Sequence, residues 1–252
     1  MEKQQQRFLF GVALAKEGRK VLLVDADPQG NLTTSLGYYK QEDMPIRLTE
    51  IMNAEMMEEE INIKDGILHH KEGIDLIPSD LSLSGVELSL VNTMSREFIL
   101  KNCLNKVKDN YDFIFIDCPP SLGILTTNAL AAADSVLIPV QCEYFALEGI
   151  MQLINTIMLA QRKVNPNLDI EGVLLTMFSN TNLGIEVIES IKGFFKERVY
   201  DTIIPRLVRL AEAPSHGKPI LEYEPRNKGT IAYLNLAKEV IDRNGTKEES
   251  VG

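Results

Sequence analysis

The sequence predicts a doubly wound α/β fold with a mostly parallel sheet. Short runs rich in Val, Ile and Leu alternate with longer segments of helical periodicity along the 252 residues. Most of the short runs are apolar at every position, which suits parallel strands that are covered by helices on both faces. Hydrophobic residues make up 44% of the chain, so a single large domain over residues 1–252 can bury a substantial core.

Each expected strand is a short apolar run, and each expected helix carries apolar residues at intervals of three and four. Residues 42–71 are acidic, Met-rich and irregular, which indicates a surface insertion. Residues 244–252 are polar, and we expect a disordered tail there. The expected strands are 21–26, 73–79, 112–117, 135–140, 170–177 and 199–205, and the expected helices are 7–17, 82–108, 126–133, 147–164, 185–197 and 230–243.

Charge, cysteine content and hydropathy indicate which partners and which cellular compartment the protein has. The net charge of -10 argues against a uniformly basic surface, so contact with nucleic acid requires a local basic patch. Three widely spaced cysteines have no metal-ligand pattern and indicate a reducing cytoplasm. No apolar run approaches the ~18 residues that span a bilayer, so we expect no membrane partner.

Two expected strands end in carboxylates. VLLVDADPQGN carries Asp25 and Asp27 at its strand end, and YDFIFIDCPPSLG carries Asp117 before Pro119. An apolar strand that ends in Asp is typical of the strand that holds Mg²⁺ in phosphate-loop NTPases. A single such Asp is more often a helix cap or a turn residue, so the evidence lies in the pair.

A basic stretch near the C-terminal end is open to two interpretations. Its cations alternate with Glu212, Glu222 and Glu224, so the stretch can be a solvated mixed face or a nucleic-acid patch. The cations are Arg206, Arg209, Lys218, Arg226 and Lys228.

At these residues the chain resembles the ParA/Soj family of partition ATPases. The segments that carry the resemblance stand in the family's order and extend it over most of the chain. They are ALAKEGRKVLLVDADPQGNLTTSLG, YDFIFIDCPPSLGILTTNAL and RLAEAPSHGKPI. The resemblance implies a phosphate-loop NTPase fold, Mg-ATP as cofactor, and a role in chromosome or plasmid partition with possible links to sporulation and replication control.

The resemblance also implies roles for individual residues. Asp27 matches the carboxylate that orients the attacking water, and Asp25 matches the neighbouring acid near the metal. Asp117 matches the acid that holds Mg²⁺ through water. Pro205 and Arg206 fall where family members contact adenine, although Leu207 departs from the usual sequence of that turn. The DNA-binding candidates are Arg206, Arg209, Lys218 and Arg226.

Family members form ATP-dependent dimers that bind DNA without sequence preference. A ParB-type centromere-binding partner stimulates hydrolysis and releases them. The resemblance therefore implies self-association, non-specific DNA and a ParB-like protein as partners. It also implies a cytoplasmic protein that associates with the nucleoid when ATP is bound.

The phosphate loop of the family is absent from this sequence. The family begins with a strand and K-G-G-x-G-K-T-T, whose backbone N–H groups and lysine hold the phosphates. Here MEKQQQRFLF precedes Gly11. We therefore expect a fold without its first strand, a loss on the order of 10 kcal/mol of apolar burial. We also expect ATP hydrolysis to be defective, although the family consists of ATP hydrolases.

Codon degeneracy suggests an origin for this N-terminus. Shifted by one base, codons for MEKQQQRFL can read G-K-T-T-T-A-V-S-L, which leads into GVALAKEG as the family does. The hypothesis is a frameshift near Phe8–Phe10, and the alternative is a genuine, unrelated N-terminus.

Two further functions stay open. One is a non-catalytic interaction protein that binds ParB or an intact ParA paralogue. The other is a MinD-like ATPase that reaches the membrane through a basic amphipathic helix. The polar, acidic end IDRNGTKEESVG argues against the second.

Overall fold

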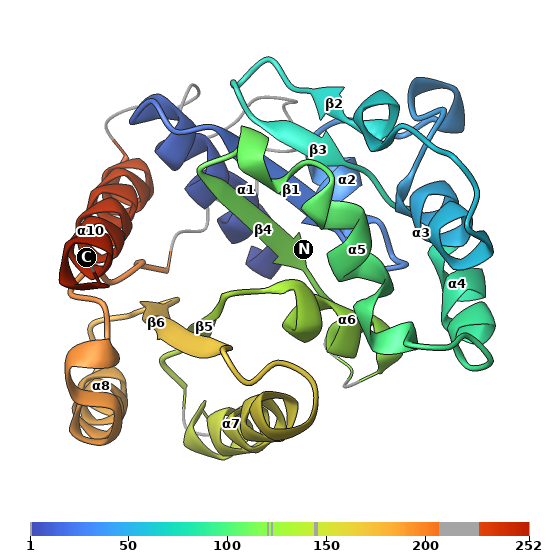
Figure 1. The fold of residues 1–252 in the computed structure, drawn as a ribbon. Helices are drawn as coiled ribbons and strands as arrows, with labels where there is room; N and C mark the ends of the chain where they lie inside the picture. Colours follow the sequence, from blue (N-terminus) through green and yellow to red (C-terminus); the bar gives the residue numbers. More distant parts are fainter. Residues whose placement is uncertain (1, 120, 122, 144–145, 207–226, 252) are drawn as a thin grey trace. The chain divides into compact units, whose positions relative to one another are not determined.

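The fold alternates helices and strands as the sequence predicts. A computed structural model describes residues 2–119, 121, 123–143, 146–206 and 227–251 (Figure 1). The strands are β1 (Val21–Asp25), β2 (Leu68–His69), β3 (Asp75–Ile77), β4 (Phe113–Asp117), β5 (Ser135–Gln141) and β6 (Asp169–Thr176). The helices are α1 (Glu2–Lys16), α2 (Asn31–Ser35), α3 (Leu48–Met57), α4 (Leu83–Leu90), α5 (Ile99–Asn105), α6 (Ile124–Ala132), α7 (Ala146–Lys163), α8 (Asn182–Phe195) and α10 (Lys228–Val251).

The chain divides into two compact units, where the sequence predicts one domain. The first unit comprises residues 1–134 and 159–168, and the second comprises residues 135–158 and 169–252. Each unit has its own sheet, in the orders β2-β3-β1-β4 and β5-β6. All pairs are parallel except β2 with β3, which confirms the mostly parallel α/β class.

The core of the first unit lies between its sheet and the helices α3 to α6. Val24, Ile77 and Leu83 are buried there with little or no exposed surface. Helix α1 packs on β1 and β4: the Phe10 ring meets Phe115 at 5.1 Å, and Gly11 leaves room for Leu23. These contacts hold β1 and β4 side by side, which positions the carboxylates at their ends.

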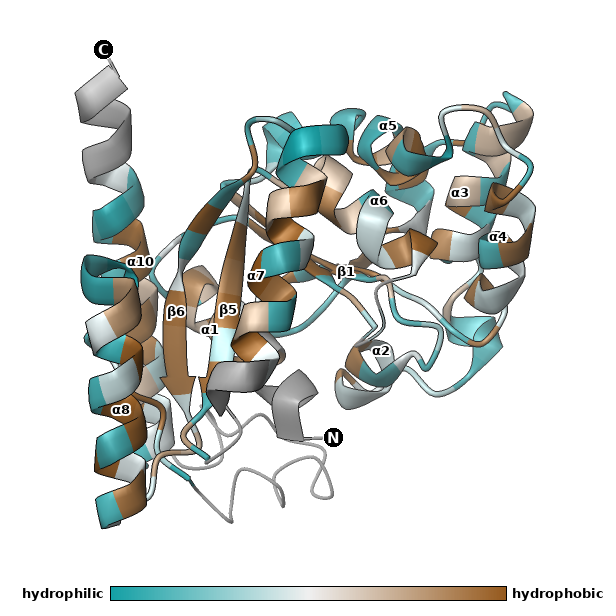
Figure 2. Cartoon of the chain, turned by 90° about the horizontal axis from the view of Figure 1, so that it is seen from below, coloured by the Kyte–Doolittle hydropathy of each residue, from teal (hydrophilic) through white to brown (hydrophobic). Residues whose placement is uncertain are grey.

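The second unit is built on two hydrophobic strands. Figure 2 shows β5 and β6 as predominantly hydrophobic, and they pair over their full lengths. The strand expected at 199–205 is reduced to two isolated bridges, Val173 with Val199 and Phe178 with Pro205. Helix α10 continues to Val251, where we expected a disordered tail.

Two further expectations in the first unit need correction. The segment expected to be an insertion at 42–71 contains α3, whose Leu48, Ile51 and Met52 are buried in the core. Its apolar periodicity was hidden by the methionines and acids around it. The helix expected at 82–108 is interrupted between α4 and α5, where Ser95 has a left-handed φ of 52°. A helix cannot continue through that conformation.

Candidate active site

The two strand-end carboxylates meet at one edge of the first sheet. Asp25 ends β1, Asp117 ends β4, and the parallel register pairs one with the other. Neighbouring strands lie about 4.8 Å apart, so the two residues are immediate neighbours. Both are buried, at 0% and 3% exposure. The structure thus brings together two acids that stand 92 positions apart in the chain.

Asp25 is held by hydrogen bonds from the segment that follows it. Its Oδ2 accepts from the Thr33 amide at 2.8 Å and from the Thr33 hydroxyl at 2.7 Å, and its Oδ1 accepts from the Asp27 amide at 3.3 Å. Burial raises the pKa of Asp25 from 3.8 to about 6, although these hydrogen bonds oppose the increase. A nearby cation would stabilise this buried carboxylate in its charged form.

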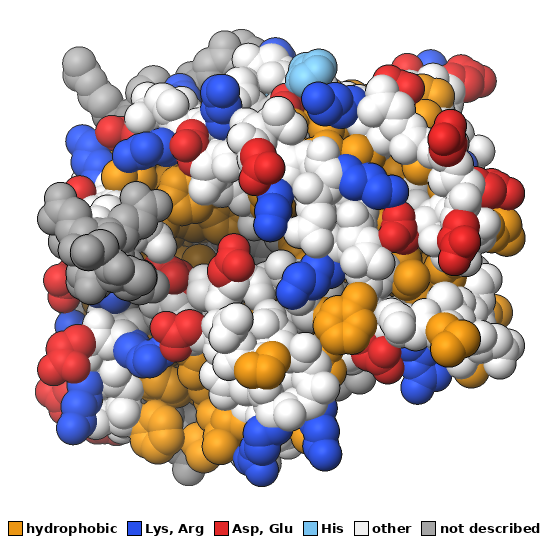
Figure 3. All heavy atoms as spheres, in the orientation of Figure 1, with side chains coloured by type: hydrophobic (Ala, Val, Ile, Leu, Met, Phe, Trp, Pro, Cys, Tyr) orange, Lys and Arg blue, Asp and Glu red, His pale blue; other side chains and the backbone are white. Residues whose placement is uncertain are grey.

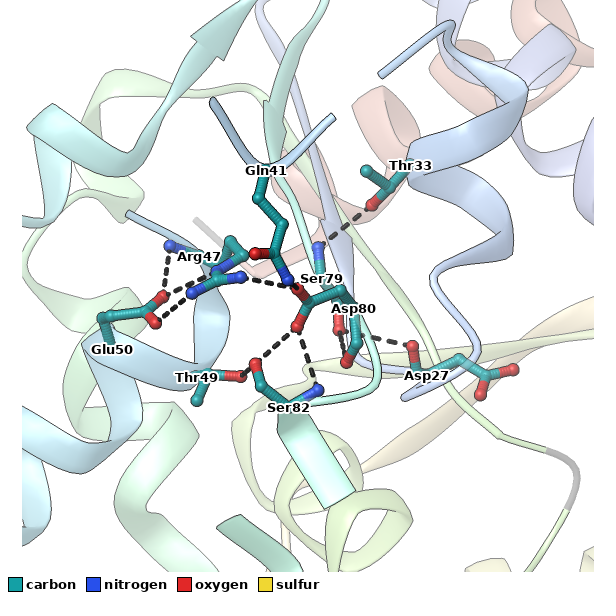
Figure 4. A network of polar contacts seen from close by, with 9 residues as sticks. All are labelled: Asp27, Thr33, Gln41, Arg47, Thr49, Glu50, Ser79, Asp80 and Ser82. Atoms are coloured by element: carbon teal, nitrogen blue, oxygen red, sulfur yellow. Dashed lines mark hydrogen bonds and ion pairs between the residues drawn. The ribbon is translucent and has the colours of Figure 1, made fainter. Parts of the chain in front are cut away.

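Asp27 lies on a tight turn between β1 and α2. Its Oδ1 accepts from the Gln29 amide at 3.0 Å, and its carbonyl accepts from the Gly30 amide at 2.9 Å. Gly30 has a left-handed φ of 59° and begins α2. The carboxylate of Asp27 points away from Ser79, whose hydroxyl donates to the Asp27 carbonyl (Figure 4). The turn thus fixes the backbone and directs the side chain away from the loop after β3.

The loop after β3 supports this turn through a network that the sequence does not reveal. The Ser79 amide donates to the Thr33 hydroxyl at 3.0 Å, which already donates to Asp25. Next to it, Asp80 accepts from the Arg47 guanidinium, which also pairs with Glu50 at 2.6 Å (Figure 4). Arg47 therefore links the start of α3 to the loop that carries Ser79. Its position in a stretch without motif gave no signal in the sequence.

The remaining predicted residues that the structure describes belong to the second unit. Pro205 and Arg206 belong to the second unit, where the Arg206 amide donates to the Phe178 carbonyl at 2.9 Å. Arg206 itself is exposed. Arg209, Lys218 and Arg226, which the sequence nominates for DNA binding, lie outside the described residues. Leu207 does so too.

The carboxylates fit a hard cation, but they do not complete a site by themselves. Two buried carboxylates are the oxygen donors that Mg²⁺ prefers, usually together with waters and substrate phosphates. Among the described residues, no group of three or more His, Cys, Asp or Glu could hold a metal ion.

Comparisons with known proteins find relatives over most of the chain. The profile of a family described as an AAA domain matches residues 3–170. The sporulation initiation inhibitor protein Soj of Bacillus subtilis is 54% identical, over 92% of this chain and 90% of the relative. The chromosome partitioning protein ParA of Myxococcus xanthus is 47% identical, over 94% of this chain and 83% of the relative.

Solved structures show the same fold. Cobyrinic acid a,c-diamide synthase from Mycobacterium smegmatis, with a bound ATP analogue and magnesium, is 34% identical with a TM-score of 0.78, over 94% of this chain and 87% of that one. The cell division ATPase MinD of Pyrococcus furiosus has a TM-score of 0.74 at 24% identity, over 95% and 93%. The second likeness concerns the fold alone.

Proposed function

The chain belongs to the ParA/Soj family of chromosome-partitioning ATPases, and we propose that in its intact form it is a Mg-ATP-dependent partition ATPase. In this proposal it dimerises with ATP, binds DNA without sequence preference and is released by a ParB-like partner. The observation that carries the proposal is the register pair of Asp25 and Asp117, with Asp27 on the adjoining turn. A cytoplasmic location follows from the same proposal, and among the described residues no helix is long and apolar enough to cross a membrane.

The proposed mechanism assigns each acid a separate task. Asp25 and Asp117 would hold Mg²⁺ through water, and Mg²⁺ bound with ATP would neutralise charge on the phosphates. Asp27 accepts a hydrogen bond from the attacking water and orients it, helped by the turn that fixes its backbone. The buried setting of Asp25 strengthens its attraction to a cation, because low dielectric weakens competing solvation.

We further propose that this chain binds Mg-ATP poorly, because its sequence contains no G-x-x-x-x-G-K-[ST] motif. In the described residues β4 pairs with β1 on one side only, and β5 pairs with β6 alone. In these residues β4 and β5 each leave one edge that a further strand could occupy. Unprotected edges of this kind promote aggregation.

Titration calorimetry with a non-hydrolysable ATP analogue and Mg²⁺ tests both proposals. The chain of residues 1–252 should show no binding. A restored chain, in which a strand and K-G-G-x-G-K-T-T-T-A-V-S-L replace the first ten residues, should bind. In the restored chain, Asp117→Asn should lower the affinity in Mg²⁺ by about tenfold and leave it unchanged without Mg²⁺. Micromolar binding and steady ATP turnover by the chain of residues 1–252 would show that the phosphate loop is not needed.

A folded restored chain that does not bind the analogue would contradict the ATPase proposal itself. An interaction protein that binds ParB or an intact paralogue would then be the better reading. Sequencing the DNA upstream of codon 11 decides the frameshift hypothesis independently. A frame that does not spell G-K-T-T-T ahead of GVALAKEG rejects it.

A further inference from the structure

Helix α4 buries one apolar face and exposes apolar side chains at its carboxyl end. Leu83, Val86 and Leu90 form the inner face and are buried in the core of the first unit. On the outer face, Leu88 is 75% exposed, and Val91, which directly follows α4, is 59% exposed. Ser84, Gly85 and Ser89 are also exposed, so the apolar outer surface is confined to the carboxyl end of the helix. Exposed apolar residues that gather in one place mark a surface that another molecule covers.

Exposed methionines extend this face toward the end of α3. Helices α3 and α4 lie side by side and run in the same direction: the Thr49 and Ser82 hydroxyls are 2.8 Å apart at their starts, and Thr93 donates to the Met56 sulfur at 3.4 Å near their ends. Four exposed residues surround this end, and we name them the α3–α4 patch. They are Met57, Leu88, Val91 and Met94.

Carboxylates border the α3–α4 patch. Glu58, Glu59 and Glu60 follow directly after Met57, and all three are exposed. They lie at the carboxyl end of α3, where the helix dipole is also negative. Figure 3 shows hydrophobic side chains exposed among acidic ones over α3 and α4. The border is therefore a region of negative potential next to an apolar surface.

Few cations offset this charge. Arg96 donates to the Val91 carbonyl at 3.0 Å and pairs with Glu97 at 3.2 Å. Lys106 pairs with Glu55 at 2.7 Å. Both cations are thus matched by their own carboxylates, which leaves the charge of the three consecutive glutamates to a partner.

We propose that the α3–α4 patch is the docking site for a basic amphipathic helix of a partner protein. The apolar side of that helix covers Leu88, Val91 and the methionines, and its Lys or Arg side chains face Glu58–Glu60. Methionine suits such a surface because its flexible side chain adapts to different partners. The site lies on residues that the proposed ATPase chemistry does not use, so it does not depend on that function.

Charge favours this occupant over two others. A second copy would bring the same three glutamates against each other in a two-fold contact, on chains that each carry a net charge of -10. An anionic membrane surface would meet the same repulsion. A basic helix satisfies both the apolar surface and its acidic border.

Fluorescence anisotropy with two synthetic helices tests the proposal on the intact chain. Both are stapled peptides of about 15 residues with a leucine face, and the opposite face is lysine in one and glutamate in the other. The lysine peptide should bind at least about tenfold more tightly, and salt should reduce the difference. Leu88→Ser with Met94→Ser should weaken binding of the lysine peptide about tenfold. Replacing Glu58–Glu60 by Gln should likewise weaken binding of the lysine peptide at low salt.

A matched control uses α8, which also exposes apolar and acidic residues. Ile185→Ser with Glu189→Gln should leave binding of the lysine peptide unchanged. If this control weakens binding as much as the patch variants, or if the patch variants bind like the parent, the proposal is wrong. It is also wrong if sedimentation finds a dimer that Leu88→Ser disrupts, because a second copy then covers the patch. Binding to phosphatidylserine vesicles that Leu88→Ser abolishes would assign it to a membrane.

Discussion

Thr33 holds Asp25 with two hydrogen bonds to the same oxygen, one from its amide at 2.8 Å and one from its hydroxyl at 2.7 Å. The hydroxyl also accepts from the Ser79 amide at 3.0 Å. One side chain thus connects the end of β1 with the loop after β3, and both groups that it serves are buried.

We predict that Thr33→Val destabilises the chain by about 2 kcal/mol. The valine has the same shape, but it leaves the buried Ser79 amide without its acceptor and Asp25 with one donor fewer. Urea denaturation measures the effect. Thr34→Val is the control, because that hydroxyl bonds only to carbonyls of its own turn. A cost below about 0.5 kcal/mol for Thr33→Val would contradict the role of its hydroxyl.

Gly30→Ala should destabilise the chain by about 2–4 kcal/mol. A methyl group at Gly30 would lie 2.8 Å from the Ser79 carbonyl oxygen, in addition to the cost of a left-handed φ. Gly37→Ala separates the two effects, since Gly37 has a φ of 91° but no atom within 4 Å of the added methyl. The control should therefore cost only about 1 kcal/mol in thermal or urea unfolding. Equal costs would show that the close approach to Ser79 is unimportant.

Arg47→Met should cost about 1–3 kcal/mol, because it removes charge-assisted bonds to Asp80 and Glu50 from a mostly buried side chain. Arg198→Met, which breaks an ion pair with about half of each side chain exposed, should cost less than about 1 kcal/mol. The two variants should therefore separate clearly in urea denaturation at pH 7.

Arg47→Met should also change how strongly acid destabilises the chain. Burial raises the pKa of Asp80, but hydrogen bonds from Ser82 and the charge of Arg47 lower it by more. The pKa of Asp80 therefore lies below its ordinary value of 3.8. Because the folded pKa is depressed, this stabilisation is present above pH 3.8 and is lost as pH falls below it. Arg47→Met should reduce the loss of stability as pH falls below about 4. If the variant loses stability in acid as steeply as the unchanged chain, the ion pair of Arg47 with Asp80 is not the cause of that loss.

Lys196→Gly should stabilise the second unit by about 1 kcal/mol. Lys196 ends α8 with φ 49° and ψ −124°, a conformation that glycine adopts without the cost paid by other residues. Lys192→Gly, four residues earlier inside the helix, should destabilise by about 1 kcal/mol. Opposite signs in thermal unfolding are the expected result, and two destabilised variants would contradict it.

The sequence predicted those features that depend on local pattern. The apolar runs that end in Asp25 and Asp117 located two strands and predicted that their acids belong to one site. Parallel pairing then follows from the alternation with helices. The strand predictions succeeded because hydrophobic periodicity is visible within about ten residues. The metal-binding role of Asp25 and Asp117 stays a prediction, although the register places the two residues side by side.

The features that the sequence missed depend on contacts between distant segments. Arg47 bonds to Asp80 across 33 positions, and nothing near either residue indicates the other. Helix α3 was hidden because its short apolar stripe lies among acids and methionines, so its burial is decided by packing against α4 and α5. The break at Ser95 was missed although Asn92, Thr93 and Ser95 are weak helix formers, because the apolar periodicity continues on both sides of it.

The register of β1 with β4 also has a consequence for how this site tolerates change over generations. Two acids level with each other on adjacent strands depend on the pairing and on the contacts of Thr33 and Ser79, not on the length of the chain that joins them. Residues can be gained or lost in the exposed turns between α3, α4 and α5 while the pair survives. A one-residue deletion inside either strand would instead turn one acid to the opposite face of the sheet. Evolution is therefore free to remodel those turns and the exposed surface around Met57 and Leu88 without disturbing Asp25 and Asp117.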